Sequence, residues 1–295
     1  MHATVLYGER DIRFEDRPEP TIVEASDAII RLPVTCICGS DLWPYRGIQA
    51  VSSPAPMGHE YSGVVEEVGR GVTSIKPGQF AIGSFFASDN TCPHCRHGYQ
   101  TSCQRFEPVV GAQARRMRVP LADGTLVATR DVPDTDMIPS LLALSDVMGT
   151  GWFAADAANV KPGATVVVVG DGAVGLLGVL SANQMGAERI IAMSRHKSRQ
   201  QLAREFGATD IVTERGDEGV ERVKQLTKGI GALRPRVRGK PGVDDAGHQG
   251  GAARRVGGLR RRAAWGDARR SAAVLLTCPS TRRSGTGPQV SAEAH

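Results

Sequence analysis

The chain has 295 residues, of which 41% are hydrophobic, and this is enough to bury two cores of ordinary size. Its longest apolar runs are strand-sized and no basic segment leads into an apolar stretch at Met1–Leu6, so the sequence predicts neither secretion nor a membrane span and favours a cytoplasmic protein. The net charge of +5 is uneven: residues 232–295 carry 13 − 4 = +9, which leaves 23 − 27 = −4 for residues 1–231.

The first 130 residues predict a mostly β domain. Short runs of β-type residues are separated by Gly and Pro, as is typical of strands joined by turns. The predicted strands are Thr4–Tyr7, Ala28–Thr35, Tyr61–Val68, Gln79–Ile82 and Thr125–Ala128.

From Leu141 the pattern changes to alternating helices and strands. A helical stretch runs through Ala158, and a turn at Lys161–Gly163 leads into the apolar strand Thr165–Val169. The predicted elements that follow are the helix Gly170–Met185, the strand Arg189–Met193, the helix Arg199–Phe206, the strand Asp210–Thr213 and the helix Glu218–Lys228. This β-α-β-α-β order is half of a dinucleotide-binding fold.

The residues from Leu233 onward show no strand or helix period, although a fourth parallel strand is expected there. One interpretation is a disordered basic tail. The other interpretation is a shifted reading frame. If synonymous codons are chosen freely from Leu233 onward and the bases are regrouped one place later, the shifted frame can encode two β-type segments joined by a turn. We therefore expect residues 232–295 to be a disordered, non-native basic tail. Sequencing the gene around codon 232 tests this, and an intact frame contradicts it.

Three separated stretches carry residues with metal-ligand chemistry. Cys36-Ile37-Cys38-Gly39-Ser40-Asp41 is followed by Gly58-His59-Glu60 and later by Asp146 in the run Leu144–Gly151. A thiolate, an imidazole and a carboxylate are what a catalytic zinc takes as ligands while leaving one position open. Taken singly, each has a simpler interpretation: a buried Cys, a turn His and a helix-capping Asp.

A second cluster contains Cys92 and Cys95 in a Cys-x2-Cys pair, with Cys103 eight residues further on. The chain has six cysteines, and it is neither small nor cysteine-dense, so metal ligation is favoured over disulfides. His94 and His97 lie nearby and are interpreted as solvated loop residues.

The third motif, Gly170-Asp171-Gly172-Ala173-Val174-Gly175, follows a strand and opens a helix. In that context glycines permit a tight turn and a close approach to a pyrophosphate held at the helix N-terminus. The next strand ends at Met193 and is followed by Ser194 and Arg195, with no carboxylate for a ribose 2′-hydroxyl. A hydroxyl and a guanidinium suit a 2′-phosphate, so NADP is favoured over NAD; the alternative is that Arg195 is an ordinary solvated residue.

Over residues 1–231 these motifs resemble the medium-chain zinc-dependent alcohol dehydrogenases. The resemblance implies an α/β protein with a GroES-like, mostly β catalytic domain at residues 1–148 and a partial Rossmann domain, a doubly wound parallel sheet, at residues 149–231. A homo-dimer or homo-tetramer is expected by the same resemblance.

Site roles also follow from the resemblance, position by position. It implies Cys38, His59 and Asp146 as ligands of a catalytic zinc, Glu60 as an occasional fourth ligand and Asp41 as the carboxylate that orients His59. Further implied roles are Ser40 as carrier of the substrate's hydroxyl proton, Thr150 beside the nicotinamide, and Asp89, Cys92, Cys95 and Cys103 as ligands of a structural zinc.

This chain departs from the family at two positions. Trp43, which cannot titrate, stands where many relatives have a His that passes the proton outward. Asp89 stands where the structural site normally has a Cys, so that lobe is either a Cys3Asp site or empty.

The predicted function is hydride transfer between an alcohol, or an aldehyde or ketone, and NAD(P), in a cleft between the two domains. The altered C-terminus is expected to lower the activity. The alternative is a catalytically inactive zinc-binding remnant, which an assay of turnover separates from the enzyme. A nucleic-acid binder acting through the +9 tail is disfavoured, because Trp265 is the tail's only aromatic residue.

Overall fold

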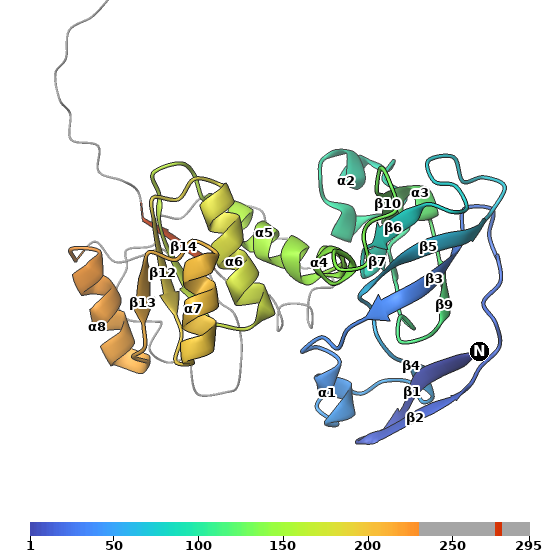
Figure 1. Cartoon of the computed structure of the whole chain (residues 1–295), viewed down its shortest axis with the longest axis horizontal. Coiled ribbons are helices and arrows are strands. Elements are labelled where there is room, and N and C mark those ends of the chain that lie inside the picture. Colours follow the sequence, from blue (N-terminus) through green and yellow to red (C-terminus); the bar gives the residue numbers. More distant parts are fainter. Residues whose placement is uncertain (230–274, 279–295) are drawn as a thin grey trace, which may run out of the picture. The chain divides into compact units, whose positions relative to one another are not determined.

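The computed structural model describes residues 1–229 and 275–278. Its internal contacts divide the chain into two units, the first ending at Thr150 and the second beginning at Gly151 (Figure 1). This division falls within helix α5 (Val147–Ala157), the element that also contains the boundary expected from the sequence. The α/β fold class predicted from the sequence is confirmed, with strands dominating the first unit and alternating strands and helices in the second.

A five-stranded antiparallel sheet is the main element of the first unit, with the strand order β10-β6-β5-β3-β9. Its central strands, β3 (Ala28–Thr35) and β5 (Tyr61–Val68), have the bounds predicted from the sequence. The remaining strands are β6 (Phe80–Gly83), β9 (Arg116–Val119) and β10 (Leu126–Ala128). The loops at the ends of β3 and β5 carry the first set of candidate site residues.

A smaller sheet of the first unit has the order β2-β1-β4, so β2 is an edge strand among the described strands. β1 (His2–Gly8) was predicted, whereas β2 (Asp11–Asp16) was not. Four of the six residues of β2 are charged, and Phe14 is 70% exposed, so no buried face marks this strand in the sequence. β4 is Ala55–Pro56.

Short elements complete the first unit. A two-stranded ribbon pairs β7 with β8, and most of the helices are single turns that place loop residues. Their bounds are α1 Leu42–Tyr45, β7 Phe86–Ala87, α2 Pro93–Arg96, the 3-10 helix η1 Gln100–Ser102, β8 Glu107–Pro108, α3 Ala122–Thr125 and α4 Ile138–Leu142.

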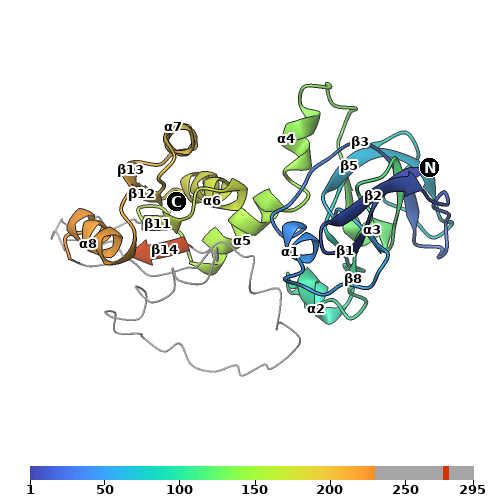
Figure 2. The same cartoon turned by 90° about the horizontal axis from the view of Figure 1, so that it is seen from below.

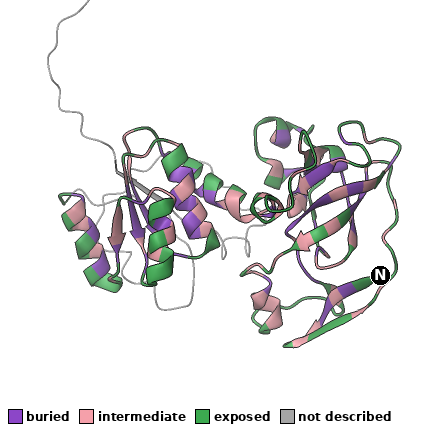
Figure 3. Ribbon diagram, in the orientation of Figure 1, coloured by how far each residue is buried: buried purple, intermediate pink, exposed green. Residues whose placement is uncertain are grey.

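The core of the first unit is closed around one large side chain. Tyr61 is fully buried, and its hydroxyl donates to the Ser84 carbonyl at 3.2 Å. A Cβ atom added at Gly83 would lie 2.1 Å from the Tyr61 ring, so only glycine leaves room for that ring on the neighbouring strand. Figure 3 shows this buried interior along the strands.

The second unit is built on the sheet order β13-β12-β11-β14, in which β11, β12 and β13 are parallel. β11 (Thr165–Val169) is a run of valines because both of its faces are covered. Val166 and Val168 pack with the helices α6 (Ala173–Gln184) and α7 (Lys197–Glu205), whereas Val167 packs with α8 (Gly216–Leu226). Helices on both faces confirm the doubly wound arrangement.

The strands β12 (Arg189–Met193) and β13 (Asp210–Val212) agree with the prediction, but β14 (Leu275–Cys278) does not. No strand was expected after Leu233, and β14 pairs antiparallel with β11 along the edge where a parallel strand was expected (Figure 2). That expectation is therefore wrong for these four residues. The expectation of a disordered tail and a shifted frame otherwise concerns residues outside the described ranges.

The helical stretch predicted from Leu141 to Ala158 is interrupted. Helix α4 ends at Leu142 and α5 begins at Val147, so Ser145 and Asp146 lie in the turn between them. Both side chains make hydrogen bonds in this turn. Among the helices of the described residues, none has the length and apolar character needed to cross a bilayer.

Candidate functional site

The turn after β3 places the first candidate ligand. The Cys38 carbonyl accepts from the Asp41 N–H at 3.1 Å, and the Asp41 Oδ2 atom accepts from the Cys38 N–H at 2.9 Å. These two bonds close the loop ahead of α1. They also fix the Cys38 side chain beside His59, which comes directly before β5.

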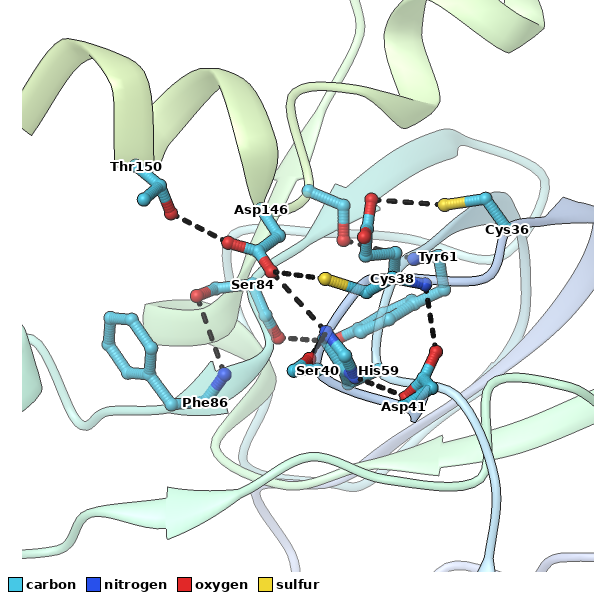
Figure 4. Close-up of polar contacts among 12 residues, drawn as sticks. Cys36, Cys38, Ser40, Asp41, His59, Tyr61, Ser84, Phe86, Asp146 and Thr150 are labelled. Atoms are coloured by element: carbon cyan, nitrogen blue, oxygen red, sulfur yellow. Dashed lines mark hydrogen bonds and ion pairs between the residues drawn. The ribbon is translucent and has the colours of Figure 1, made fainter. Parts of the chain in front are cut away.

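Cys38, His59 and Asp146 converge although they come from three distant stretches of the chain (Figure 4). The Nε2 atom of His59 lies 3.3 Å from Oδ2 of Asp146, and Cys38 Sγ lies 3.9 Å from the same oxygen. Together with Glu60, their candidate ligand atoms all lie within 4.8 Å of one another.

These separations match a tetrahedral metal site. Zinc bonds of about 2.0–2.1 Å to nitrogen and oxygen, at the tetrahedral angle, separate those two ligand atoms by about 3.3 Å. A thiolate bond of about 2.3 Å gives a sulfur–oxygen separation of about 3.6 Å. The donor set and its spacing therefore fit one zinc ion.

A further layer of contacts orients these side chains. Asp41 Oδ1 lies 3.2 Å from His59 Nδ1, which leaves Nε2 to face Asp146. The Thr150 hydroxyl donates to Asp146 Oδ1 at 2.7 Å, so Thr150 fixes the carboxylate from the next turn of helix. Ser40 Oγ lies 3.5 Å from His59 Nε2. Carboxylate partners of this kind determine which imidazole nitrogen is free to ligate.

Burial and the two neighbouring carboxylates control the charge of His59. Burial disfavours the protonated ring, but hydrogen bonds to Asp146 and Asp41 outweigh it and raise the pKa of His59 to about 12. In the absence of metal the ring therefore carries a proton at neutral pH, which offsets the nearby negative charges.

Glu60 is almost fully buried, at 2% exposure, and the sequence did not predict its partner. The Cys36 thiol donates to Glu60 Oε2 at 3.0 Å. Burial first, and then this hydrogen bond, raise the pKa of the Cys36 thiol, so that it stays a donor. The Cys-Ile-Cys spacing places both sulfurs in one loop, but it does not by itself indicate that Cys36 contacts Glu60.

The backbone before α5 anchors Asp146. The Ser145 hydroxyl donates to the Gly83 carbonyl at 2.6 Å and accepts from the Tyr61 N–H at 3.0 Å. Ser145 thereby ties the turn that carries Asp146 to strands β5 and β6.

The second cluster is also assembled in one place. Asp89, Cys92, Cys95 and Cys103 each offer a ligand atom within 4.8 Å of the others, and the sulfur atoms of Cys92 and Cys95 are 3.5 Å apart. The N–H groups of Thr91 and Cys92 donate to Asp89 Oδ1 and lower the pKa of Asp89 to about 2, so it is ionised. Three thiol sulfurs and one carboxylate suit zinc.

The two histidines near this cluster are not part of it. His94 is half-buried and His97 is exposed, and the Nδ1 atom of His97 lies 2.7 Å from the Pro93 carbonyl. Neither belongs to the group of candidate ligands in the described part of the chain.

The glycine-rich loop joins β11 to α6 in the second unit. Gly170 has φ = +117°, and a Cβ atom at Gly175 would lie 2.3 Å from the Gly170 carbonyl oxygen, so both positions require glycine. Gly172 directly precedes Ala173 at the start of the helix, and nothing lies within 4 Å of a Cβ atom built there. Gly170, Gly172, Ala173, Val174 and Gly175 thus surround the N-terminus of α6.

The end of β12 holds an arrangement that the sequence did not predict. Ser194 is 2% exposed, and its hydroxyl donates to Asp171 Oδ2 at 2.9 Å. Arg199, in the first turn of α7, donates to Asp171 Oδ1 at 3.1 Å. Arg195 is exposed and forms no ion pair with the residues that the structure describes.

Comparisons with known proteins agree with this geometry. Residues 24–140 match the family described as alcohol dehydrogenase GroES-like domain, and residues 173–233 match zinc-binding dehydrogenase. Zinc-type alcohol dehydrogenase B from Aspergillus flavus is 35% identical over 79% of this chain and 56% of its own length. Medium chain reductase/dehydrogenase ucsI from an Acremonium species is 34% identical over 79% of this chain and 83% of its own length.

A solved structure shares the fold. Alcohol dehydrogenase TADH from Thermus sp. ATN1 superposes with a TM-score of 0.70 and 29% identity, over 78% of this chain and 68% of that chain. The shared region covers about the same share of this chain as the two sequence matches.

Proposed function

This chain belongs to the zinc-type, medium-chain alcohol dehydrogenase family, and we propose that it transfers hydride between an alcohol, or the matching aldehyde or ketone, and NADP. Family membership supports its assignment as an oxidoreductase. One observation carries the proposal: a thiol, an imidazole and a carboxylate from three separated stretches lie at the mutual distances of a tetrahedral zinc site.

We assign Cys38, His59 and Asp146 as the ligands of that zinc, with Glu60 close enough to serve as a fourth. When bound, the ion supplies the Lewis acidity that lowers the pKa of an alcohol. Asp41 keeps the His59 ring in the ligating orientation, and Thr150 does the same for Asp146.

Ser40 is the proposed carrier of the substrate's hydroxyl proton. Its hydroxyl lies 3.5 Å from His59 Nε2, so it stands beside the ligands without being one of them. A hydroxyl in this place can accept a proton and donate its own, which is the relay that an alcohol needs. Trp43 takes no part in this relay, because an indole N–H does not titrate.

The dinucleotide is proposed to bind at the glycine-rich loop, with its pyrophosphate at the N-terminus of α6. Arg195, exposed and unpaired within the described ranges, supports NADP as the preferred form. The cluster of Asp89, Cys92, Cys95 and Cys103 is proposed to hold a second, structural zinc.

The test is an assay of the full chain with zinc, NADPH or NADH, and a panel of short aldehydes, ketones and secondary alcohols. We expect turnover with at least one compound, and faster turnover with NADPH than with NADH. Zinc binding without any turnover would support the inactive remnant, whereas failure to bind zinc at Cys38 would overturn the dehydrogenase proposal.

Zinc binding is expected to release protons. His59 has a pKa of about 12 without metal, and a ligating imidazole must be neutral, so the ion has to displace that proton. The apparent zinc affinity should therefore rise by about tenfold per pH unit for each proton displaced, from about pH 6 to 8.

This effect can be measured by titrating zinc into weakly buffered protein with a pH indicator. The Cys38→Ser variant is the control, because its proton release comes only from the second cluster. An affinity at the first site that does not change over this pH range would contradict the assignment of His59 as a ligand.

A further inference from the structure

Both carboxylate oxygens of Asp171, in the glycine-rich loop, accept a hydrogen bond. The residue is 8% exposed, Oδ2 accepts the Ser194 hydroxyl and Oδ1 accepts the Arg199 guanidinium. Burial opposes its ionisation, but the bonds from Ser194 and Arg199 outweigh burial and lower the pKa of Asp171. Asp171 is therefore negatively charged at neutral pH. Asp171 follows β11 in the chain, and it contacts Ser194 at the end of β12, where the strand itself carries no acid.

The hydrogen-bond donors of this arrangement determine which ligand groups it can bind. A serine hydroxyl has one proton, and that of Ser194 is given to Asp171. A ligand group that reaches Ser194 Oγ, which is 2% exposed, then meets only lone pairs. A ribose 2′-hydroxyl can donate to it, whereas an ionised 2′-phosphate has only acceptor oxygens near neutral pH. For Ser194 to donate to a phosphate, as the sequence predicts, its hydroxyl must first release its hydrogen bond to Asp171.

Arg199 is in a similar position. Its side chain is 49% exposed, so it can reach a ligand, but Asp171 holds one of its N–H groups and cancels part of its charge. Arg195 has no such partner among the described residues. Ser194 and Arg199, two groups that could bind a phosphate beside Arg195, are therefore already bound by Asp171.

We propose that Asp171 is a specificity-determining residue, whose carboxylate competes with the 2′-phosphate of NADP for the Ser194 hydroxyl and the Arg199 guanidinium and so moderates the preference for NADP. This rests on the proposed dinucleotide function.

Two small nucleotides isolate the effect of the 2′-phosphate. 2′,5′-ADP carries it and 5′-AMP lacks it, and calorimetric titration of the full chain measures each dissociation constant without turnover. In Asp171→Asn, which keeps the side-chain shape and removes the charge, we expect 2′,5′-ADP to bind about tenfold more tightly. The affinity for 5′-AMP should stay within about twofold.

Arg199→Gln should act in the opposite direction and weaken 2′,5′-ADP binding by about tenfold, again with little change for 5′-AMP. In the double variant the gain from Asp171→Asn should shrink, because part of it comes from releasing Arg199. The matched control is Asp210→Asn, which removes an acid at the start of β13 that pairs with Arg189, the first residue of β12. It should leave both affinities unchanged.

The outcomes separate the two proposals. If 5′-AMP binds normally but Asp171→Asn leaves 2′,5′-ADP binding unchanged or weaker, the role of Asp171 is overturned and the dehydrogenase proposal stands. If the wild-type chain and all variants bind neither nucleotide, the dinucleotide site is overturned, and the role of Asp171 with it. Retained 5′-AMP binding also shows that a variant has kept the fold of the loop.

Discussion

Cys38→Ser is expected to remove the zinc ion at the first site and to lower kcat/KM by more than about a hundredfold, beyond the loss typical of changing an outer partner of a metal ligand. Serine replaces a thiolate that zinc binds strongly with a hydroxyl that stays protonated at neutral pH. Among the candidate ligands in the described residues, His59, Asp146 and Glu60 would then remain to bind the ion. Metal content per chain and the carbonyl-reduction assay measure both effects.

Cys36→Ser is the matched control for this change. Cys36 lies in the same loop but outside the group of candidate ligands, and a serine can still donate to Glu60. This variant should keep its zinc. Asp89→Ala should lose the other ion, from the second cluster, and should leave zinc at Cys38. Equal zinc content in Cys38→Ser and Cys36→Ser would show that Cys38 is not a ligand.

Gly83→Ala is expected to lower the free energy of unfolding by about 3 kcal/mol, at the upper end of the usual cost of overpacking a core. The added methyl group would lie 2.1 Å from the Tyr61 ring, which is fully buried and has no space to move into. Either the ring or strand β6 must shift. Denaturant unfolding followed by circular dichroism measures the change.

The same substitution should weaken zinc binding, because the Gly83 carbonyl accepts from Ser145, the neighbour of Asp146. Gly8→Ala is the control: its Cβ atom meets nothing within 4 Å, and its φ is not positive. We expect that variant to change stability by less than about 0.5 kcal/mol. A Gly83→Ala protein as stable as Gly8→Ala would contradict the packing argument.

Strands with a buried face could be predicted from the sequence, and strands without one could not. β3, β5, β11 and β12 were found with their full bounds because apolar residues fill at least one side of each. β2 was missed because charge dominates it, and β14 because it is a four-residue run within a segment that has no other periodic pattern. Pairing forms both strands: β2 pairs with its neighbour β1 across a short turn, whereas β14 pairs with β11, a partner far away in the chain that leaves no local pattern.

The candidate ligands were identifiable from residue type and flanking motif, but the contacts that support them were not. Nothing local in the sequence links Ser145 to Gly83, or Thr150 to Asp146, beyond a helical spacing that many residues share. Asp171 is part of the glycine-rich motif, but the sequence indicates no role for it, since only the fold brings it to Ser194. The supporting residues of this site depend on tertiary structure.

The charges of β2 have a consequence for association between copies of the chain. β2, whose outer edge no described strand pairs, offers backbone groups and the exposed Phe14 side chain to another edge strand. Antiparallel docking of two such strands about their centres would set Asp11 of one copy opposite Asp16 of the other, at both ends. Like charges directly opposite each other repel, and this repulsion, reduced by the pairing of Asp11 with Arg13, opposes self-assembly into larger sheets at this edge.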